Sequence, residues 1–480
     1  MSITSPASSR FDQQHAIVIG GSMAGLLTAR VLSEHFKQVT IIERDHLTDG
    51  AESRKGVPQG RHGHVLLASG AVVLAKIFPD LFPKLAQDGA AVHSSSDARW
   101  YQFGVWKAPF PVERQAVYPS RPFLEQHVRA CLIARENVRF IDACEVTQLC
   151  VKENQITGVV LRSRTAEQHE ENLAANVVID ASGRGSRTPQ WLASLGYGQV
   201  EESSIRSDVG YVTRIYRRPD QPPFSWRLLI VYSTPPDEKR AGYVLPIEDD
   251  QWMVTLAGML RNYPPDDEEG FLEFARSLPT SDLYEAIKDA EPMTPIVTYK
   301  YTANRWRHYE RMMRLPEGFI VMGDALCSFN PVYGQGMSVA ALEATLLDTF
   351  LRKQQPDNIA GWTQRFQKSL VKVVKNPWKL ATSDDFRFPE NEGKRPFGTD
   401  LFNWYMRRIH ELMASNPLVT LRGYQVLLLL KPLSVLFDPR IIWAVLGKEL
   451  ASRQQKPGAA RSTHEASSST PTPTEDIIAR

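Results

Sequence analysis

The stretch Ala16-Ile17-Val18-Ile19-Gly20-Gly21-Ser22-Met23-Ala24-Gly25 decides how this chain of 480 residues begins to fold. Its first four residues are apolar and predict a buried strand, and the glycines after them predict a tight turn into a helix. Backbone N–H groups at the start of such a helix can face the pyrophosphate of a dinucleotide. Glycine also suits a turn that only joins a strand to a helix, so the pattern leaves both uses open.

A second apolar run, residues 39–42, ends at Glu43. Its distance from Gly25 is close to the ~20 residues expected between a dinucleotide-binding loop and its ribose-binding acid. Glu43 can accept hydrogen bonds from ribose hydroxyls and disfavours a 2′-phosphate, which indicates a dinucleotide of the FAD or NAD type. Residues 15–44 therefore predict a right-handed strand–helix–strand unit of the Rossmann kind. Ser22 stands where the usual G-x-G-x-x-G pattern has its middle glycine.

A second glycine-bearing segment lies late in the chain, at Gly323-Asp324 and at residues 331–336. It too follows an apolar run, residues 319–322, and it leads into a helix that begins near Met337. Because both loops join a strand to a helix, they predict binding sites for the two ends of one long dinucleotide.

Composition narrows the class of protein. The formal net charge is +2, so the chain is not expected to bind nucleic acid, and its length allows two or more domains. The four cysteines have no C-x-x-C spacing, which argues against a disulfide framework and against a zinc site, and no metal is expected. Residues 1–11 are polar and lack the apolar stretch of a secretory signal, which predicts a cytoplasmic location.

The order of strand-like and helix-like segments predicts an α/β chain with interleaved domains. Strands are expected at residues 138–141, 156–161, 177–179, 209–216, 227–232, 241–245 and 252–257, and helices at residues 65–85, 121–135 and 270–278. A Rossmann-like, dinucleotide-binding domain should comprise residues 12–90, 120–200 and 300–380. A largely antiparallel sheet domain that binds substrate should comprise residues 91–119 and 201–299. A helical C-terminal region should span residues 381–450, and disordered tails should span residues 1–11 and 454–480.

Three segments together resemble the signature motifs of FAD-dependent monooxygenases of the aromatic-hydroxylase type. They are the 20–25 loop, the run VIDASGRGSR at residues 178–187 and the run GDALCSFNPVYGQGMS at residues 323–338. Their order and spacing match that family across residues 12–350. Through the run RKGVPQGRHGH at residues 54–64, the chain resembles most the branch of this family that contains polyether-type polyene epoxidases and, more distantly, squalene epoxidase.

The resemblance implies FAD as the resident cofactor. Asp324 should bind its ribityl hydroxyls, and residues 334–336 with the following helix N-terminus should face the pyrimidine edge of the flavin, where a helix dipole stabilises negative charge. Arg121 should reach the phosphate or ribityl region, with an exposed arginine at a helix start as the alternative. The residues expected to bind the cofactor are Gly20, Ser22, Gly25, Glu43, Arg44, Arg54, Gln59, Arg61, Arg121, Asp324, Pro331, Gly334, Gly336 and Met337.

Residues 54–64 have two possible uses. Glycine-spaced basic residues can approach a cofactor closely, as the resemblance implies, or they can form an ordered surface loop. A zinc site at His62 and His64 is not expected, because no further cysteine or histidine lies nearby at ligand spacing.

The resemblance implies a reaction in which NAD(P)H reduces the flavin transiently, O₂ adds at the flavin C4a carbon, and the hydroperoxide delivers oxygen to an electron-rich carbon. The substrate should be a hydrophobic polyene, isoprenoid or aromatic metabolite of the kind made in secondary metabolism. No side-chain nucleophile is needed and no catalytic residue is assigned. A phenol would need a base, and since none is identified, an alkene is favoured.

Aromatic residues recur in the expected antiparallel strands, at Tyr211, Tyr216, Trp226, Tyr232, Tyr243 and Trp252. They can line an apolar substrate pocket or form ordinary sheet core. The apolar runs at residues 424–430 and 441–446 are too short for a membrane span, which needs ~20 residues. Packing on the core is expected there, with a weak peripheral membrane contact as the minority hypothesis.

Two other functions fit the same cofactor site. A flavin-dependent reductase of isoprenoid double bonds would share it, and so would a flavin-binding protein without catalysis. A halogenase is disfavoured because the chain contains no W-x-W-x-I-P pattern.

Overall fold

The computed structural model describes residues 14–111, 114–165, 169–220, 222, 224–353 and 361–454, with side chains described up to residue 450. The expected disordered tails, residues 1–11 and 454–480, lie outside this part of the chain except for Gln454, which ends a helix.

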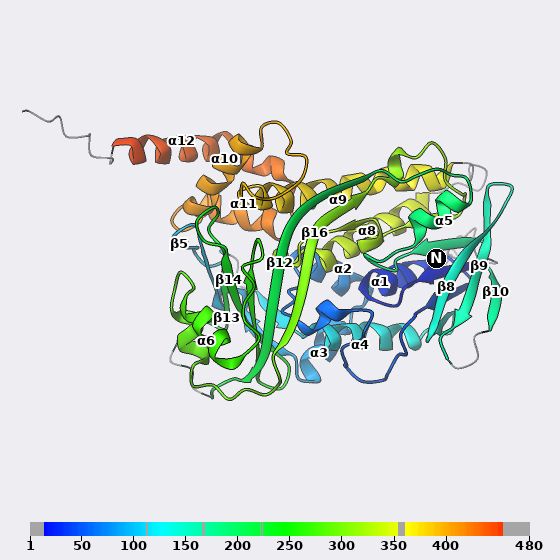
Figure 1. The fold of residues 1–480 in the computed structure, drawn as a ribbon, viewed down its shortest axis with the longest axis horizontal. Helices are drawn as coiled ribbons and strands as arrows, with labels where there is room; N and C mark the ends of the chain where they lie inside the picture. The colour runs from blue at the N-terminus through cyan, green and yellow to red at the C-terminus, as the bar shows by residue number, and fades with distance from the viewer. Residues whose placement is uncertain are drawn as a thin grey trace, which may run out of the picture.

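A parallel sheet forms the core of one half of the molecule, as predicted (Figure 1). Its described strands lie in the order β17 (Phe319–Val321), β11 (Val177–Asp180), β1 (His15–Ile19), β2 (Gln38–Ile42) and β7 (Val138–Ile141). All four pairings are parallel, and the strands are almost wholly apolar because helices cover the sheet. The contacting helices include α1 (Met23–Leu32), α4 (Arg121–Ile133) and α9 (Trp362–Asp385), and α8 (Gly336–Lys353) packs on α1 and α9.

The edge strand β17 receives side-chain hydrogen bonds from α9. Gln367 is buried and donates to the Val321 carbonyl at 3.1 Å, and it accepts from the Val321 N–H at 3.3 Å. Thr363 Oγ1 accepts from the Gly318 N–H at 2.8 Å. These bonds satisfy backbone groups that an edge strand would otherwise leave open, so α9 is fixed to the sheet at its beginning.

A long antiparallel sheet forms the second half, in the order β18 (Cys327–Ser328), β16 (Val297–Arg307), β12 (Glu202–Arg217), β15 (Gln251–Gly258), β14 (Arg240–Ile247), β13 (Leu228–Val231), β4 (Ala98–Gln102) and β5 (Val105–Trp106). Within this sheet, the pairing of β13 with β4 is the only parallel one among the described strands. The helices α6 (Glu268–Arg276) and α7 (Asp282–Ile287) pack on this sheet. The expected domain boundary at residue 300 falls inside β16, which pairs with β12 on both sides of it.

Several elements were not expected from the sequence. β9 (Gln155–Ser163) matches the strand expected at residues 156–161, but its partners β8 (Cys144–Lys152) and β10 (Glu170–Ala174) were not expected. The three strands form an antiparallel sheet at the end of the molecule opposite the C-terminal helices (Figure 1). β3 (Ala91–Ser94) pairs with β6 (Gln115–Tyr118). The segment expected to be helical at residues 65–85 forms two helices, because Pro79 separates α2 (Ala68–Ile77) from α3 (Leu81–Gln87).

The C-terminal region is helical, as expected. It contains α10 (Thr399–Leu412), α11 (Pro417–Leu427), η6 (Leu433–Phe437) and α12 (Pro439–Gln454), which pack around an apolar core of their own. Among the described residues, no helix is both long enough and apolar enough to cross a membrane. Trp443, Leu446 and Leu450 are exposed along one side of α12. The weak membrane contact and the cytoplasmic location stay predictions.

Gly25 fixes the spacing between α1 and β1. A Cβ atom at this position would lie 1.8 Å from the carbonyl oxygen of Gly20, which is backbone and cannot move aside. Gly20 itself has φ +104°, a conformation that other residues rarely adopt. The glycines therefore permit a close turn as well as a possible phosphate contact.

We expect Gly25→Ala to lower the free energy of unfolding by about 2 kcal/mol or more, because α1 would have to move away from the sheet. Urea unfolding followed by circular dichroism measures this change. Gly447→Ala is the matched control, since a Cβ at that exposed helical position meets nothing within 4 Å. A Gly25→Ala protein as stable as the control variant would contradict the packing argument.

Candidate active site

A cavity of about 400 Å³ lies beyond the carboxyl ends of β1, β2 and β11. The early loop and the late loop meet there, although they are far apart in the sequence. The predicted cofactor residues that line it are Gly20, Ser22, Glu43, Arg44, Gln59, Arg121, Asp324, Pro331, Gly334, Gly336 and Met337. The described structure thus brings most of the predicted set to one place.

Three of the predicted residues are not among the described lining of this cavity. Gly25 lies behind the wall, where it allows the close turn. Arg54 is also behind the wall and contacts Glu43, Gly21 and Glu125. Arg61 is exposed to solvent, because the short helix η1 (Pro58–Arg61) ends at this residue and directs it outward.

Glu43 is held rigidly at the end of β2. Its Oε2 atom accepts from the Gly21 N–H at 2.7 Å, and its Oε1 atom accepts from the Asp45 N–H at 3.0 Å. Arg54 lies 3.2 Å from Oε2 and balances the buried charge. The carboxylate is therefore fixed to the glycine loop itself, at the position where the sequence predicts the ribose.

Arg121 is buried, so the alternative of an exposed arginine at a helix start is wrong. It donates to Ser22 Oγ at 2.7 Å and to Glu125 Oε2 at 2.6 Å. Ser22 Oγ in turn donates to Glu125 at 3.0 Å. Burial acts to raise the pKa of Glu125, but Arg121 and Arg54 outweigh it and lower that pKa. Ser22, in the position usually taken by glycine, thus links the loop to Arg121.

Asp324 lies in the late loop, opposite two arginines. Burial raises the pKa of its carboxyl group, while Arg184 and Arg121 act in the opposite direction. Gly323 has φ +62°, and a Cβ there would approach the Ala24 Cβ to 2.6 Å. The two loops therefore touch directly beside Asp324.

Asp180, in the middle signature segment, has a structural role. Its buried carboxylate accepts from the Ser182 N–H at 2.9 Å and from the hydroxyls of Ser186 and Thr188, each at 2.5 Å. These bonds fold residues 180–188 into a compact loop. Arg184 projects from the loop, lines the cavity and lies over the Tyr301 ring at 4.5 Å.

Residues 54–64 contribute to the wall through Gly56, Val57, Pro58, Gln59, Gly63 and His64, so the alternative of a plain surface loop is wrong for this run. His62 Nδ1 lies 2.8 Å from Thr213 Oγ1, and the Gly63 N–H donates to Thr255 Oγ1 at 2.9 Å. Burial lowers the pKa of His62 and of His64 to about 4, so both rings are neutral at pH 7. Among the described residues, no cluster of three or more His, Cys, Asp or Glu side chains is placed to hold a metal ion.

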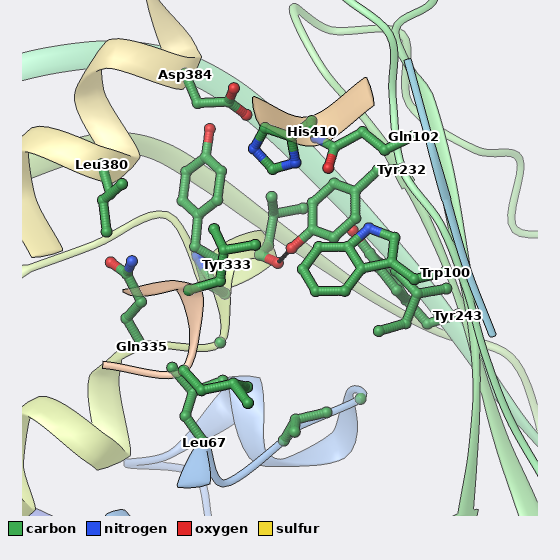
Figure 2. A pocket seen from close by; sticks show the side chains of 18 of the residues that line it. Leu67, Trp100, Gln102, Tyr232, Tyr243, Tyr333, Gln335, Leu380, Asp384 and His410 are labelled. Carbon is green, nitrogen blue, oxygen red and sulfur yellow. Dashed lines mark hydrogen bonds between the residues drawn. The ribbon is translucent and has the colours of Figure 1, made fainter. Parts of the chain in front are cut away.

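Figure 2 shows the lining of a second cavity, which has a volume of about 170 Å³. The two share Gly63, Pro331, Gly334 and Gln335. Three of the predicted aromatic residues, Tyr211, Tyr232 and Tyr243, line the second cavity. The other three, Tyr216, Trp226 and Trp252, belong to the core beneath α6 and α7. Both uses that the sequence allowed for these aromatics therefore occur.

The wall between the cavities is fixed by buried hydrogen bonds. Tyr211 Oη donates to Asn330 Oδ1 at 2.7 Å and accepts from the Val332 N–H at 2.9 Å. Tyr232 Oη donates to the Val332 carbonyl at 2.5 Å. Asp385, at the end of α9, accepts from Tyr333 Oη at 2.7 Å. Burial raises the pKa of Asp385 to about 7.

The donor set fits a flavin dinucleotide. The loop N–H groups and Arg121 suit a pyrophosphate, and Asp324 suits the ribityl hydroxyls. The N-terminus of α8 begins at Gly336, on the cavity wall, and offers the positive end of a helix dipole. Arg121 Nε is buried and has no hydrogen-bond partner among the described residues, so this donor can bind an oxygen atom of a phosphate.

Substitution of Asp324 tests the late loop. We expect Asp324→Ala to weaken FAD binding about tenfold or more, because it removes a charged hydrogen-bond acceptor. Flavin absorbance of the purified protein measures the occupancy, and circular dichroism checks that the fold is kept. Asp266→Ala, at an exposed position, is the control. Full flavin occupancy in Asp324→Ala would remove the residue from the site.

Glu343 supports the same loop from α8 and was not found from the sequence. Its buried Oε2 atom accepts from the Gly323 N–H at 2.6 Å, while Oε1 has no partner among the described residues. Burial raises its pKa from 4.5 to about 8, so the group is mainly protonated at pH 7. Because the pKa is raised on folding, its contribution to stability is complete below pH 4.5 and is lost as the pH rises through about 8.

We therefore expect the free energy of unfolding to fall between pH 4.5 and about 8 more steeply in the wild type than in Glu343→Gln. Glutamine can accept the same hydrogen bond and has no charge at any pH. Urea unfolding across this range measures the difference. Parallel pH profiles for the two proteins would show that Glu343 does not titrate as its burial implies.

Comparison with known proteins agrees with this geometry. Residues 16–215 match the family model for FAD dependent oxidoreductase. Protein Rv3254 of Mycobacterium tuberculosis (strain ATCC 25618 / H37Rv) is 30% identical over 386 residues, which cover 78% of this chain and 81% of that protein.

Two solved structures share the fold. The flavin-dependent brominase Bmp2 aligns with a TM-score of 0.61 and 15% identity, over 92% of this chain and 100% of that chain. The p-nitrophenol 4-monooxygenase PnpA from Pseudomonas putida DLL-E4 aligns with a TM-score of 0.59 and 15% identity, over 87% of this chain and 98% of that chain. At such identities the likeness concerns the fold alone. The chain belongs to the FAD-dependent oxidoreductases and has the fold of the aromatic-hydroxylase type of FAD-dependent monooxygenase.

Proposed function

We propose that this chain is a monooxygenase that uses NAD(P)H and O₂ to epoxidise or hydroxylate a hydrophobic polyene, isoprenoid or aromatic metabolite. The observation that supports the proposal best is the shared wall of the two cavities. An aromatic-lined cavity meets the candidate cofactor cavity at Gly63, Pro331, Gly334 and Gln335. A substrate in the first cavity would therefore lie directly beside a cofactor in the second.

FAD would lie stretched between the early and late loops. Glu43 would bind the ribose of its adenosine part, and the N–H groups of residues 20–25 with Arg121 would bind its pyrophosphate. Asp324 would bind the ribityl hydroxyls, and the start of α8 would lie at the pyrimidine edge. When bound, FAD supplies the transfer of electrons from NAD(P)H to O₂ and of one oxygen atom to the substrate.

The protein has two tasks in such a reaction. Its aromatic cavity has to exclude water, and it has to hold one carbon of the substrate near the shared wall. The hydrogen bonds of Tyr211, Tyr232 and Asp385 keep that wall in one position, which serves the second task.

The chemistry of the wall favours an alkene as the reacting group. Within the described structure, Gly63, Pro331, Gly334 and Gln335 carry no acid or base. A phenol would gain from a base at this point, whereas an isolated double bond needs none. We therefore favour epoxidation over aromatic hydroxylation as the reaction.

We expect aerobic incubation with NADPH and a set of polyenes and phenols to give a product heavier by one oxygen atom, as measured by mass spectrometry. Asp324→Ala should give none. Bromide is added to one sample and oxygen is removed from another. A brominated product would indicate a halogenase, and a saturated product without oxygen would indicate a reductase. Bound FAD without substrate-stimulated NADPH oxidation would indicate a binding protein. Each of these three results would contradict the proposal.

A further inference from the structure

The aromatic cavity has a polar end. Its cofactor end is formed by Gly63, Pro331, Gly334 and Gln335. Polar side chains of β4, α9, the segment after α9 and α10 also line the cavity, at Gln102, Ser383, Asp384, Arg387, Asn403 and His410. Figure 2 shows Asp384, His410 and Gln102 together at one end of the cavity, with Gln335 and Leu67 at the other. A bound molecule would therefore have one end in a polar environment and the other end near the cofactor.

Two polar atoms of this lining are unsatisfied. His410 Nδ1 and Asn403 Oδ1 are buried and have no hydrogen-bond partner within the described chain. The other end of the Asn403 amide donates to the Ser383 carbonyl at 2.7 Å, which fixes its orientation. Unsatisfied buried polar atoms cost stability, and a ligand group that bonds to them would recover that cost. Both residues lie on the cavity side of α10, two helical turns apart.

The charged side chains at the polar end already have partners within the protein. Asp384 accepts from Arg387 Nε at 2.7 Å, so these two charges pair with each other. Burial, with Lys107 and Arg387 nearby, lowers the pKa of His410 well below its usual value, and the ring is neutral at pH 7. Burial also lowers the pKa of Lys107 well below its usual value, and its amine donates to Gln102 Oε1 at 2.9 Å. A charged ligand group would therefore have to lose its hydration and compete for side chains that already have partners, whereas an uncharged group avoids this cost.

The middle of the cavity suits a flat or unsaturated body. The rings of Trp100 and Tyr232 are stacked, with their centroids 5.5 Å apart and their planes at 26°. Leu67, Ile230 and Leu380 complete the apolar lining. Aromatic and alkene groups gain from contact with such ring faces and edges.

On the basis of the function proposed above, we propose that the substrate is amphipathic and carries an uncharged hydroxyl group that binds His410, at the end of the molecule remote from the reacting carbon. A hydroxyl can donate or accept and so suits either tautomer of the neutral imidazole. Asn403 offers an acceptor for a second hydroxyl. His410 is then a residue that determines specificity and does not take part in the chemistry.

Three naphthalenes of the same shape test this proposal: 2-naphthol, 2-methylnaphthalene and 2-naphthoate. Isothermal titration calorimetry of the oxidised holoenzyme, without NAD(P)H, measures their binding at equilibrium. We expect 2-naphthol to bind about tenfold more tightly than either of the others, as one hydrogen bond to a buried group predicts. Equal affinities, tighter binding of 2-naphthoate or no binding of 2-naphthol would overturn the proposal.

Variants of α10 test the assigned residue. His410→Phe keeps a ring beside Phe103, whose centroid lies 5.3 Å from that of His410, but removes the hydrogen bond. We expect it to lose the preference for 2-naphthol and to bind 2-methylnaphthalene as the wild type does. Met406→Leu, on the same side of α10 and in the same cavity, is the control and should keep the preference. A preference that persists in His410→Phe would overturn the assignment.

These measurements need no turnover, so they separate the two proposals. Selective binding of 2-naphthol without any oxygenated product in the assay above would refute the monooxygenase function and leave the hydroxyl site standing. An oxygenated product without selective binding of 2-naphthol would support the monooxygenase function and refute the hydroxyl site.

Discussion

The segment from Asn330 to Gly334 has to form part of two cavities at once, and its rigidity is the constraint on which the candidate site depends. The antiparallel sheet holds it through Tyr211 and Tyr232, and α9 holds it through Asp385. Asn304, from β16, adds a hydrogen bond to the Asn330 N–H at 2.6 Å. Elements from both halves of the molecule therefore meet on five residues. A shift of either half would change the distance between the proposed substrate and the proposed cofactor.

Buried carboxylates hold the loops of the cofactor cavity. Asp180 folds its own loop, Glu125 joins two arginines to Ser22, and Glu343 binds the backbone of the late loop. Several donors surround Asp180 and Glu125 and offset the cost of burying their charge, whereas Glu343 has one donor and is mainly protonated at pH 7. Two of these carboxyl groups also bind loop backbone directly, since Asp180 accepts from the Ser182 N–H and Glu343 accepts from the Gly323 N–H.

The parallel half of the fold could be predicted from the sequence because its signals are local. The runs at residues 16–19 and 39–42 are apolar, and a glycine turn and a helical segment separate them, so the parallel strand–helix–strand unit follows from one stretch. β8 and β10 were missed because Glu145, Gln148 and Glu171 interrupt their apolar pattern, as is usual for strands with one face in water. The predicted domain boundary at residue 300 falls inside β16 because the middle of this strand is polar and exposed, and its pairing with β12 is a long-range contact that the sequence does not reveal.

The same distinction between local signals and long-range contacts applies to the candidate site. Glu43 could be placed at the cavity from its spacing after Gly25, and Asp324 from the resemblance of its loop to a family motif. Glu125 and Asp385 lie on helices whose periodicity indicates only a buried face, and their partners come from distant segments. Arg61 has the composition of a phosphate-binding residue, but the end of η1 directs it into solvent. A sequence pattern specifies which residues are near a loop and leaves open the direction in which each side chain points.

The separate core of the C-terminal helices has an evolutionary consequence. α10 and α11 close one side of the aromatic cavity, yet they pack around apolar residues that are distinct from the core of the parallel sheet. Mutations there can reshape the cavity at little cost to the rest of the fold. Selection for a new metabolite can thus act on α10 and α11 while the residues of the parallel-sheet half stay unchanged.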